Sequence, residues 1–105
     1  MDPLRVVQDC VRHGRVEMAD HAYDQLLERR IDPEDVIEGA LQGTLVEDYR
    51  ASRNEARILT LQAESGGGRL HVVWDLPWRD DEPAIFVTAY RPDRSQWHDD
   101  LMRRR

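Results

Sequence analysis

Apolar residues recur with the spacing of an α-helix in three runs through the N-terminal part of the chain. The pattern predicts helices over residues 3–13, 21–29 and 33–42, with a short extended piece over 15–18 between the first two. The last two helices are separated by a very short turn and should form a helical hairpin. Each helix follows an aspartate, a residue type that caps helix N-termini: Asp2, Asp20 and Asp32.

After Gly43 the apolar period changes from 3.6 to 2, which is typical of strands. Strands are predicted over 44–49, 57–64, 69–76 and 84–90. Their connections are short, so the strands should pair in sequence order as an antiparallel meander. The expected fold is therefore α+β, with the N-terminal helices packed on one face of a four-stranded antiparallel meander sheet. The tail from Ser95 is expected to dock back through Trp97 and Leu101, with the three C-terminal arginines in solvent.

Strand alternation assigns side chains to the two faces of this sheet. One set is uniformly apolar and is expected beneath the helices: Leu59, Leu61, Ala63, Leu70, Val72, Trp74, Leu76, Ile85, Val87 and Ala89. The other set is mixed and is expected on an open face: Ile58, Thr60, Gln62, His71, Val73, Asp75, Phe86, Thr88 and Tyr90. Because directly opposed residues of a hairpin share a face, His71 should lie opposite Thr88 or Tyr90.

Length and composition limit the number of domains and argue against disulfide-bonded, metal-binding and membrane-spanning classes of protein. The 105 residues fit a single domain, 1–105. The one cysteine, Cys10, excludes an internal disulfide, and no spacing of His, Cys, Asp and Glu indicates a metal site, so no cofactor is expected. No apolar run approaches the roughly 20 residues of a membrane span, and no signal sequence is visible. The expected location is the cytoplasm.

Charge is distributed unevenly along the chain. The formal net charge is −6, and all of the 15 basic residues are arginine. Acidic residues outnumber arginine strongly in residues 1–49, whereas the two are nearly balanced in residues 50–105. The large basic surface usual in nucleic-acid-binding proteins is missing, so RNA would have to use a local patch on the sheet. An acidic face would instead suit a basic partner protein.

Two groups of polar residues could carry chemistry. An imidazole at His71 beside the hydroxyl of Thr88 or Tyr90 suits acid–base work or phosphate binding, although a histidine that only bonds across a strand explains the same pattern. His21, Gln25 and Arg29 are spaced by four and form one polar stripe on the second helix. An exposed helix flank is the alternative interpretation of that stripe.

The segment MADHAYDQLLERRIDPEDVIEGALQGTLVEDY (18–49), with RLHVVWDL (69–76) and IFVTAYRPDRSQW (85–97), resembles the domain-of-unknown-function family 4258. The resemblance covers residues 15–98, with 1–14 as an extra N-terminal helix and 99–105 as a tail. Gln25 stands where that family tends to have arginine, and Arg30 where it tends to have glycine. The first departure removes a cation from the stripe, and the second alters a turn.

The family is similar in layout to the RelE and BrnT toxins of toxin–antitoxin systems, which implies a bacterial origin and metal-independent cleavage of RNA on the open sheet face. The resemblance implies that a His or Glu removes the proton of a ribose 2′-hydroxyl, while Arg29 or Arg57 stabilises the charged phosphorane. A non-catalytic module that binds an antitoxin-like or other protein partner is the alternative, and the oligomeric state stays open. The implied site residues are His21, Arg29, Glu47, His71, Thr88 and Tyr90.

Overall fold

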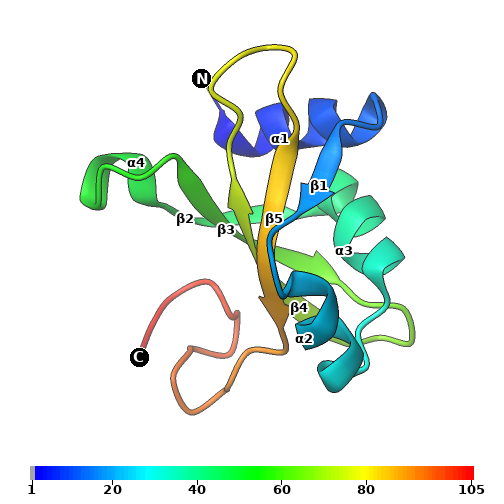
Figure 1. Ribbon diagram of the computed structural model, residues 1–105. Helices are drawn as coiled ribbons and strands as arrows, with labels where there is room; N and C mark the ends of the chain where they lie inside the picture. The colour runs from blue at the N-terminus through cyan, green and yellow to red at the C-terminus, as the bar shows by residue number, and fades with distance from the viewer. Residues whose placement is uncertain (1) are drawn as a thin grey trace.

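The computed structural model describes residues 2–105 and shows helices and a sheet packed as layers (Figure 1). The helices are α1 (Pro3–Arg12), α2 (Ala22–Arg29), α3 (Pro33–Gly39) and α4 (Tyr49–Ser52), with a 3₁₀ turn η1 (Ala40–Gln42) after α3. The strands are β1 (Val16–Met18), β2 (Thr44–Asp48), β3 (Arg57–Ala63), β4 (Arg69–Asp75) and β5 (Ala84–Tyr90). The predicted α+β class is confirmed.

The described residues form a five-stranded sheet in the order β1-β5-β4-β3-β2. Strands β2 to β5 make the predicted antiparallel meander, but β1 adds a fifth strand that runs parallel to β5. The prediction of four strands was therefore wrong. Three residues are too few to show a period of 2, and the partner of β1 lies at the far end of the chain, so no local pattern could reveal this pairing.

The caps of α1 and α3 are as predicted. Asp2 accepts a hydrogen bond from the amide of Leu4 at 3.0 Å, and Asp32 accepts one from the amide of Glu34 at 2.9 Å. The predicted cap of α2, Asp20, was wrong, because His21 occupies the cap position in a left-handed conformation with φ 65°. Arg30 ends α2 with φ 55°, a conformation that glycine adopts at much lower cost.

One face of the sheet packs against α1, α2, α3 and η1 to form the main core. Strands β3 to β5 contribute Ile58, Leu70, Val72, Trp74, Ala84, Phe86 and Ala89 to it. Thr60 and Gln62 of β3 also lie on this face, where hydrogen bonds satisfy their polar side chains. The Gln62 amide donates to the carbonyl of Val36 at 2.8 Å and accepts from Trp74 Nε1 at 3.1 Å, and Thr60 donates to Gln62 at 2.9 Å.

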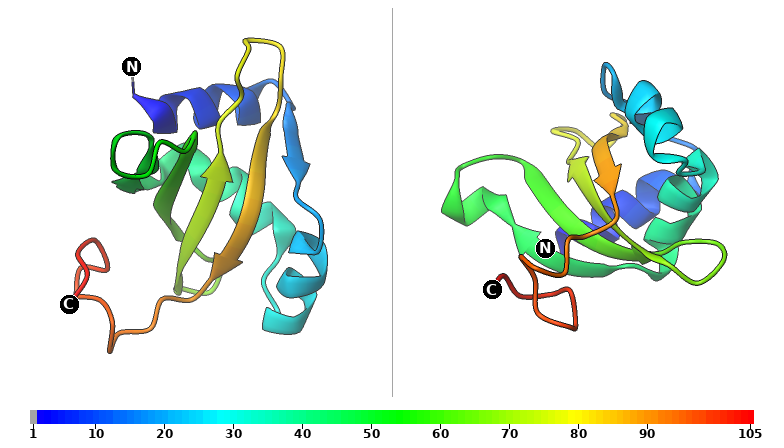
Figure 2. Two further views of the ribbon diagram at one scale, coloured as in Figure 1. Left: turned by 60° about the vertical axis from the view of Figure 1, so that its left-hand side comes forward. Right: turned by 90° about the horizontal axis from the view of Figure 1, so that it is seen from below.

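Part of the second face is covered by residues 97–105, called the strap below (orange to red in Figure 2). Trp97 and Leu101 of the strap pack with Tyr49, Leu59 and Leu61 into a smaller core. The docking of Trp97 and Leu101 is confirmed, but the prediction that this face is open was wrong at Leu59, Leu61 and His71, which the strap covers.

The face assignment of β3 was also wrong. Ile58 lies opposite Trp74, and Leu59 lies opposite Val73, which places the two leucines of β3 beneath the strap. Because β3 is buried on both faces from Ile58 to Gln62, its polar residues Thr60 and Gln62 do not mark a solvent-exposed face. In β5, a bulge between Phe86 and Thr88 breaks the alternation, so Phe86 joins the helix-side core.

No helix among residues 2–105 has the length and apolar character needed to cross a membrane.

Candidate functional site

His71 is fully buried between the sheet and the strap. Its Nε2 lies 2.8 Å from the carbonyl oxygen of Leu101 and donates to it. Its other ring nitrogen, Nδ1, is buried without a hydrogen-bond partner. Burial lowers the pKa of His71 below its ordinary value, although the bond to the carbonyl opposes this. His71 is therefore a neutral side chain that anchors the strap, and solvent cannot reach it in this conformation.

The ring of Tyr90 lies next to His71, as the second of the two predicted pairings requires. The residues are directly opposed on β4 and β5, and their ring centroids are 5.7 Å apart in an edge-to-face arrangement. On its other side His71 meets Trp97 at 4.5 Å. Burial raises the pKa of the Tyr90 hydroxyl, while the nearby Arg104 guanidinium lowers it. The phenol is therefore protonated at neutral pH.

Glu47 on β2 holds the far end of the strap. Both of its oxygens accept hydrogen bonds from Arg104, each at 2.9 Å, and one also accepts from the Tyr49 hydroxyl at 2.5 Å. These bonds keep the pKa of Glu47 below its ordinary value despite partial burial. Arg104 also lies over the ring of Trp97 at 4.7 Å, so the expectation that it extends freely into solvent was wrong.

Arg29 and Thr88 meet at the edge of the sheet. Arg29 donates to Thr88 Oγ1 at 3.0 Å and to the carbonyl of Ala89 at 2.8 Å, and Thr88 donates to Gln25 Oε1 at 2.7 Å. The predicted stripe of α2 is thus bonded to β5 through Gln25 and Arg29. His21 is exposed, and its side chain makes no capping bond.

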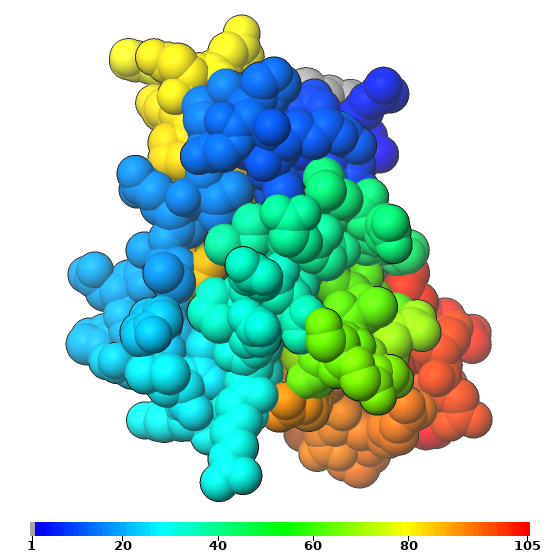
Figure 3. Space-filling model, turned by 90° about the vertical axis from the view of Figure 1, so that its right-hand side faces the viewer, coloured from blue at the N-terminus to red at the C-terminus, as the bar shows by residue number. Residues whose placement is uncertain are grey.

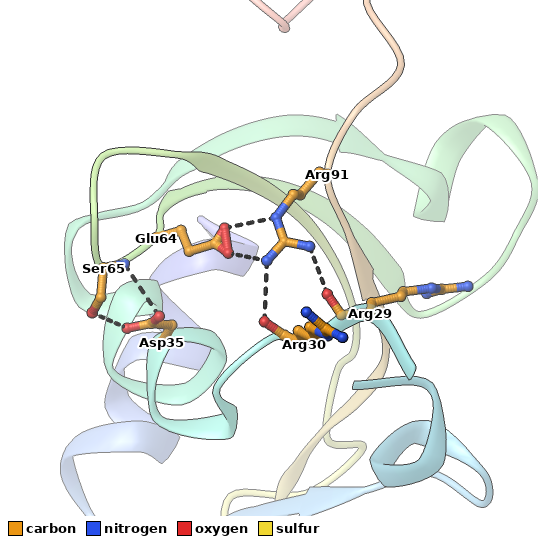
Figure 4. A network of polar contacts seen from close by, with 6 residues as sticks. All are labelled: Arg29, Arg30, Asp35, Glu64, Ser65 and Arg91. Carbon is orange, nitrogen blue, oxygen red and sulfur yellow. Dashed lines mark hydrogen bonds and ion pairs between the residues drawn. The ribbon is translucent and has the colours of Figure 1, made fainter. Parts of the chain in front are cut away.

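Figure 4 shows how the end of α2 is fixed by Arg91, the residue that follows β5. Arg91 donates to the carbonyls of Arg29 at 2.6 Å and Arg30 at 3.1 Å, and it forms an ion pair with Glu64. Carbonyls at a helix C-terminus lack helical partners, so a guanidinium there stabilises the end of α2.

Most arginines of the sheet half are neutralised by carboxylates. Seven of the ten arginines in the described residues 50–105 form ion pairs. They are Arg50, Arg57, Arg79, Arg91, Arg103, Arg104 and Arg105. Arg57, expected to stabilise a phosphorane, instead donates to Asp75 at 2.6 Å. Little of this positive charge is left for a phosphate.

A groove of about 530 Å³ opens at the end of the sheet where β4 leads into the loop 76–83. This acidic groove is lined by Glu17, Glu55, Arg57, Asp75, Trp78 and Glu82, among others. Trp78 at its rim is 83% exposed. The sequence analysis did not single out this groove. An aromatic residue inside the charged loop PWRDDEP was the available signal, but the approach of Glu17 from β1 depends on the unpredicted fifth strand.

The structure thus brings some of the predicted site residues into contact but does not place all of them in one site. Thr88 joins Arg29, Tyr90 joins His71, and Glu47 joins the strap, whereas His21 contacts none of them in any bond described. Among residues 2–105, no cluster of three or more His, Cys, Asp or Glu side chains is placed to hold a metal ion.

Comparison with known proteins gives one result. Residues 18–91 match the family described as a domain of unknown function, DUF4258, a span within the 15–98 expected from the motifs. No curated protein and no solved structure matches the chain, so the likeness to RelE and BrnT stays an expectation. The match covers well over half of the 105 residues, and the chain belongs to the DUF4258 family.

Proposed function

We propose that this domain is a non-catalytic protein-binding module whose acidic groove receives a positively charged segment of a partner. The observation that carries the proposal is Trp78, 83% exposed at the rim of a groove where carboxylates dominate. A large aromatic side chain left in water favours a protein interface, where Trp is enriched among the residues that dominate affinity.

The charge of the groove selects the partner. Four carboxylates line it, from Glu17, Glu55, Asp75 and Glu82, against the single guanidinium of Arg57. Asp75 and Glu55 both pair with Arg57, at 2.6 and 3.9 Å. Glu82 pairs with Arg79 at 3.9 Å and accepts from the backbone amide of Trp78 at 3.2 Å. The carboxylates still outnumber the guanidinium groups. An RNA backbone would be repelled here, whereas Arg or Lys side chains would be attracted and could stack on the Trp78 ring.

Three of the residues that the resemblance assigns to catalysis have structural partners. His71 is fully buried, Glu47 is held by Arg104, and Arg29 is bonded to β5. A general base must reach the proton that it removes, and these contacts prevent that while the strap is in place.

Binding of peptides tests the proposal. An arginine-rich peptide labelled with a fluorophore should bind the protein, and a glutamate-rich peptide of equal length should not. Trp78→Ser and the pair Glu55→Gln and Glu82→Gln should each weaken binding by about tenfold or more. Glu34→Gln, an exposed carboxylate on α3, is the matched control. Equal binding by all variants, or no preference for the basic peptide, would refute the proposal.

Metal-independent cleavage of RNA is the second candidate function. It is favoured by one observation: Tyr90 lies beside His71 and close enough to Arg29, Glu47 and Arg104 for their charges to act on its pKa. The test is RNA cleavage by purified protein, by Arg29→Ala and by Tyr90→Phe. The candidate requires loss of activity in at least one variant, because equal residual cleavage in all three would indicate a contaminant.

A further inference from the structure

Exposed apolar side chains gather on one side of the molecule. Four large hydrophobic residues are exposed in residues 2–105, and three of them lie on β1 and α2: Met18, Tyr23 and Leu27, at 45%, 49% and 59% exposure. In Figure 3, segments 16–18 and 22–29 (blue to cyan) lie at the surface with no other part of the chain across them. Such a grouping is unusual on a surface that has no partner.

The exposed side of α2 is organised as two parallel lanes. Tyr23 and Leu27 are four residues apart and lie on one line along the helix. Asp24 and Glu28 form the adjacent line, about 100° further round, and both are exposed. The buried Ala22 and Leu26 lie about 100° round the helix on the other flank of Tyr23 and Leu27, roughly opposite the acidic line.

One of the two arginines at the end of α2, Arg29, is held away from these lanes. Arg29 bonds to Thr88 and to the carbonyl of Ala89 on β5. Asp20, in the turn before α2, is also exposed and adds a negative charge near the N-terminus of the helix. The outer side of α2 is therefore an apolar line bordered by negative charge.

We propose that this side of α2, with Met18 at its N-terminal end, is a docking surface for a basic amphipathic helix of a partner protein. The partner would set leucine-like side chains on Tyr23 and Leu27 and lysine or arginine against Asp24 and Glu28. Charge complementarity selects this occupant, because an acidic or uncharged apolar helix would leave the acidic lane unpaired. The surface is separate from the acidic groove and does not depend on it.

The docking surface is preorganised. Gln25 and Arg29 tie α2 to Thr88, and Arg91 binds the carbonyls of Arg29 and Arg30 (Figure 4). A helix held at several points loses little freedom when a partner binds, so little of the binding free energy is spent on ordering it.

The probe is a synthetic helical peptide of about four turns with leucines on one side and lysines along the border of that side. A peptide of the same composition in scrambled order and a peptide with glutamate in place of lysine are its controls. We expect amide chemical-shift changes concentrated in residues 18–29 and binding of the basic helical peptide alone. Leu27→Ser should weaken binding by about tenfold or more, and Asp24→Asn with Glu28→Gln should remove the preference for lysine over glutamate.

Trp78→Ser is the matched control, because it removes the other exposed hydrophobic residue and should leave this binding unchanged. Trp78→Ser should weaken binding of the arginine-rich peptide at the acidic groove. The proposal for the groove and the proposal for α2 can therefore be rejected independently of each other. Because the Leu27 side chain is exposed, the Leu27→Ser variant should keep the melting temperature of the wild type. Shift changes outside residues 18–29, or equal binding of the scrambled peptide, would overturn the proposal. So would self-association of the wild-type protein that Leu27→Ser abolishes, since a second copy would then be the occupant.

Discussion

The two faces of the sheet are covered in different ways. The helix-side face is closed by elements that carry a large apolar core, with Trp74, Phe86 and Leu26 buried completely. Part of the strap-side face is closed by nine residues without regular helix, which depend on two apolar side chains and a few polar bonds. The comparison indicates that the first cover is part of the fold, whereas the second is a local structure that can open while the rest stays folded.

The largest effect is expected in the helix-side core. Phe86→Ala removes a fully buried ring that lies 5.9 Å from Trp74 and should lower the free energy of unfolding by about 3–5 kcal/mol. Urea denaturation measures this loss. Trp78→Ala, on an exposed side chain, should change stability by no more than about 0.5 kcal/mol. A loss of less than about 1 kcal/mol in Phe86→Ala would mean that this face is not the main core.

Removal of the strap should cost less. Deletion of residues 97–105 loses the burial of Trp97 and Leu101 but also the entropic cost of ordering the segment, for a net loss of about 1–3 kcal/mol. The double variant Trp97→Ala and Leu101→Ala should lower the free energy of unfolding by no more than the deletion does. Once the strap is released, none of its contacts remains to be lost. A greater loss in the double variant would show that the strap cannot open independently.

The third prediction concerns pH. The pKa of His71 is below 6.5 in the folded protein, so the unfolded or released state binds more protons once the pH falls below that value. Docking of the strap is complete above pH 6.5 and weakens as the pH falls, by roughly 1 kcal/mol over the first pH unit. The groups around the ring are Tyr90, Trp97, the Leu101 carbonyl, Glu47 and Arg104.

Hydrogen exchange of the Leu101 amide, which donates to the His98 carbonyl, reports the opening of the strap. The exchange rates should be measured between pH 5 and 7 and corrected for intrinsic exchange. Glu47 stays ionised over this range because its pKa lies below 4.5. His71→Gln should make the protection independent of pH over this range. Unchanged pH dependence in that variant would assign the effect to another group.

The smallest effect is expected at Glu47. Glu47→Gln weakens the bidentate contact with Arg104, whose side chain is half exposed, and should cost about 0.5–1 kcal/mol in strap docking, less at high salt. A double-mutant cycle with Arg104→Ala isolates the pair. Asp99→Asn, in the more exposed pair with Arg105, is the control and should have no measurable effect. A coupling energy of zero for Glu47 and Arg104 would leave His71 and the apolar contacts as the anchors.

Local patterns in the sequence were enough to predict most elements. The capping aspartates of α1 and α3, the four strands of the meander and the docking of Trp97 and Leu101 follow from spacing and residue type. The motifs also identified the family. These features depend on residues near one another in the chain, or on hairpins that short connections enforce.

Features set by distant contacts were not predictable in this way. Gln62 seemed suited to an open face because it is polar, but the carbonyl of Val36 and the indole of Trp74 satisfy it inside the core. Register limited the partner of His71 to Thr88 or Tyr90, and Tyr90 is the one that the structure pairs with it. The burial of His71 depends on the strap, which no strand pattern indicates. The acidic groove requires Glu17 to be placed by β1, whose partner is β5.

That parallel pairing has a consequence for how the protein is made. Strand β1 and helix α2 leave the ribosome early, while β5 and Arg91, which hold them, are among the last parts of the described chain to be synthesised. Until then Ala22 and Leu26 have no sheet to cover, and the outer lanes of α2 have no fixed orientation. A partner that recognises α2 would therefore distinguish finished chains from truncated ones.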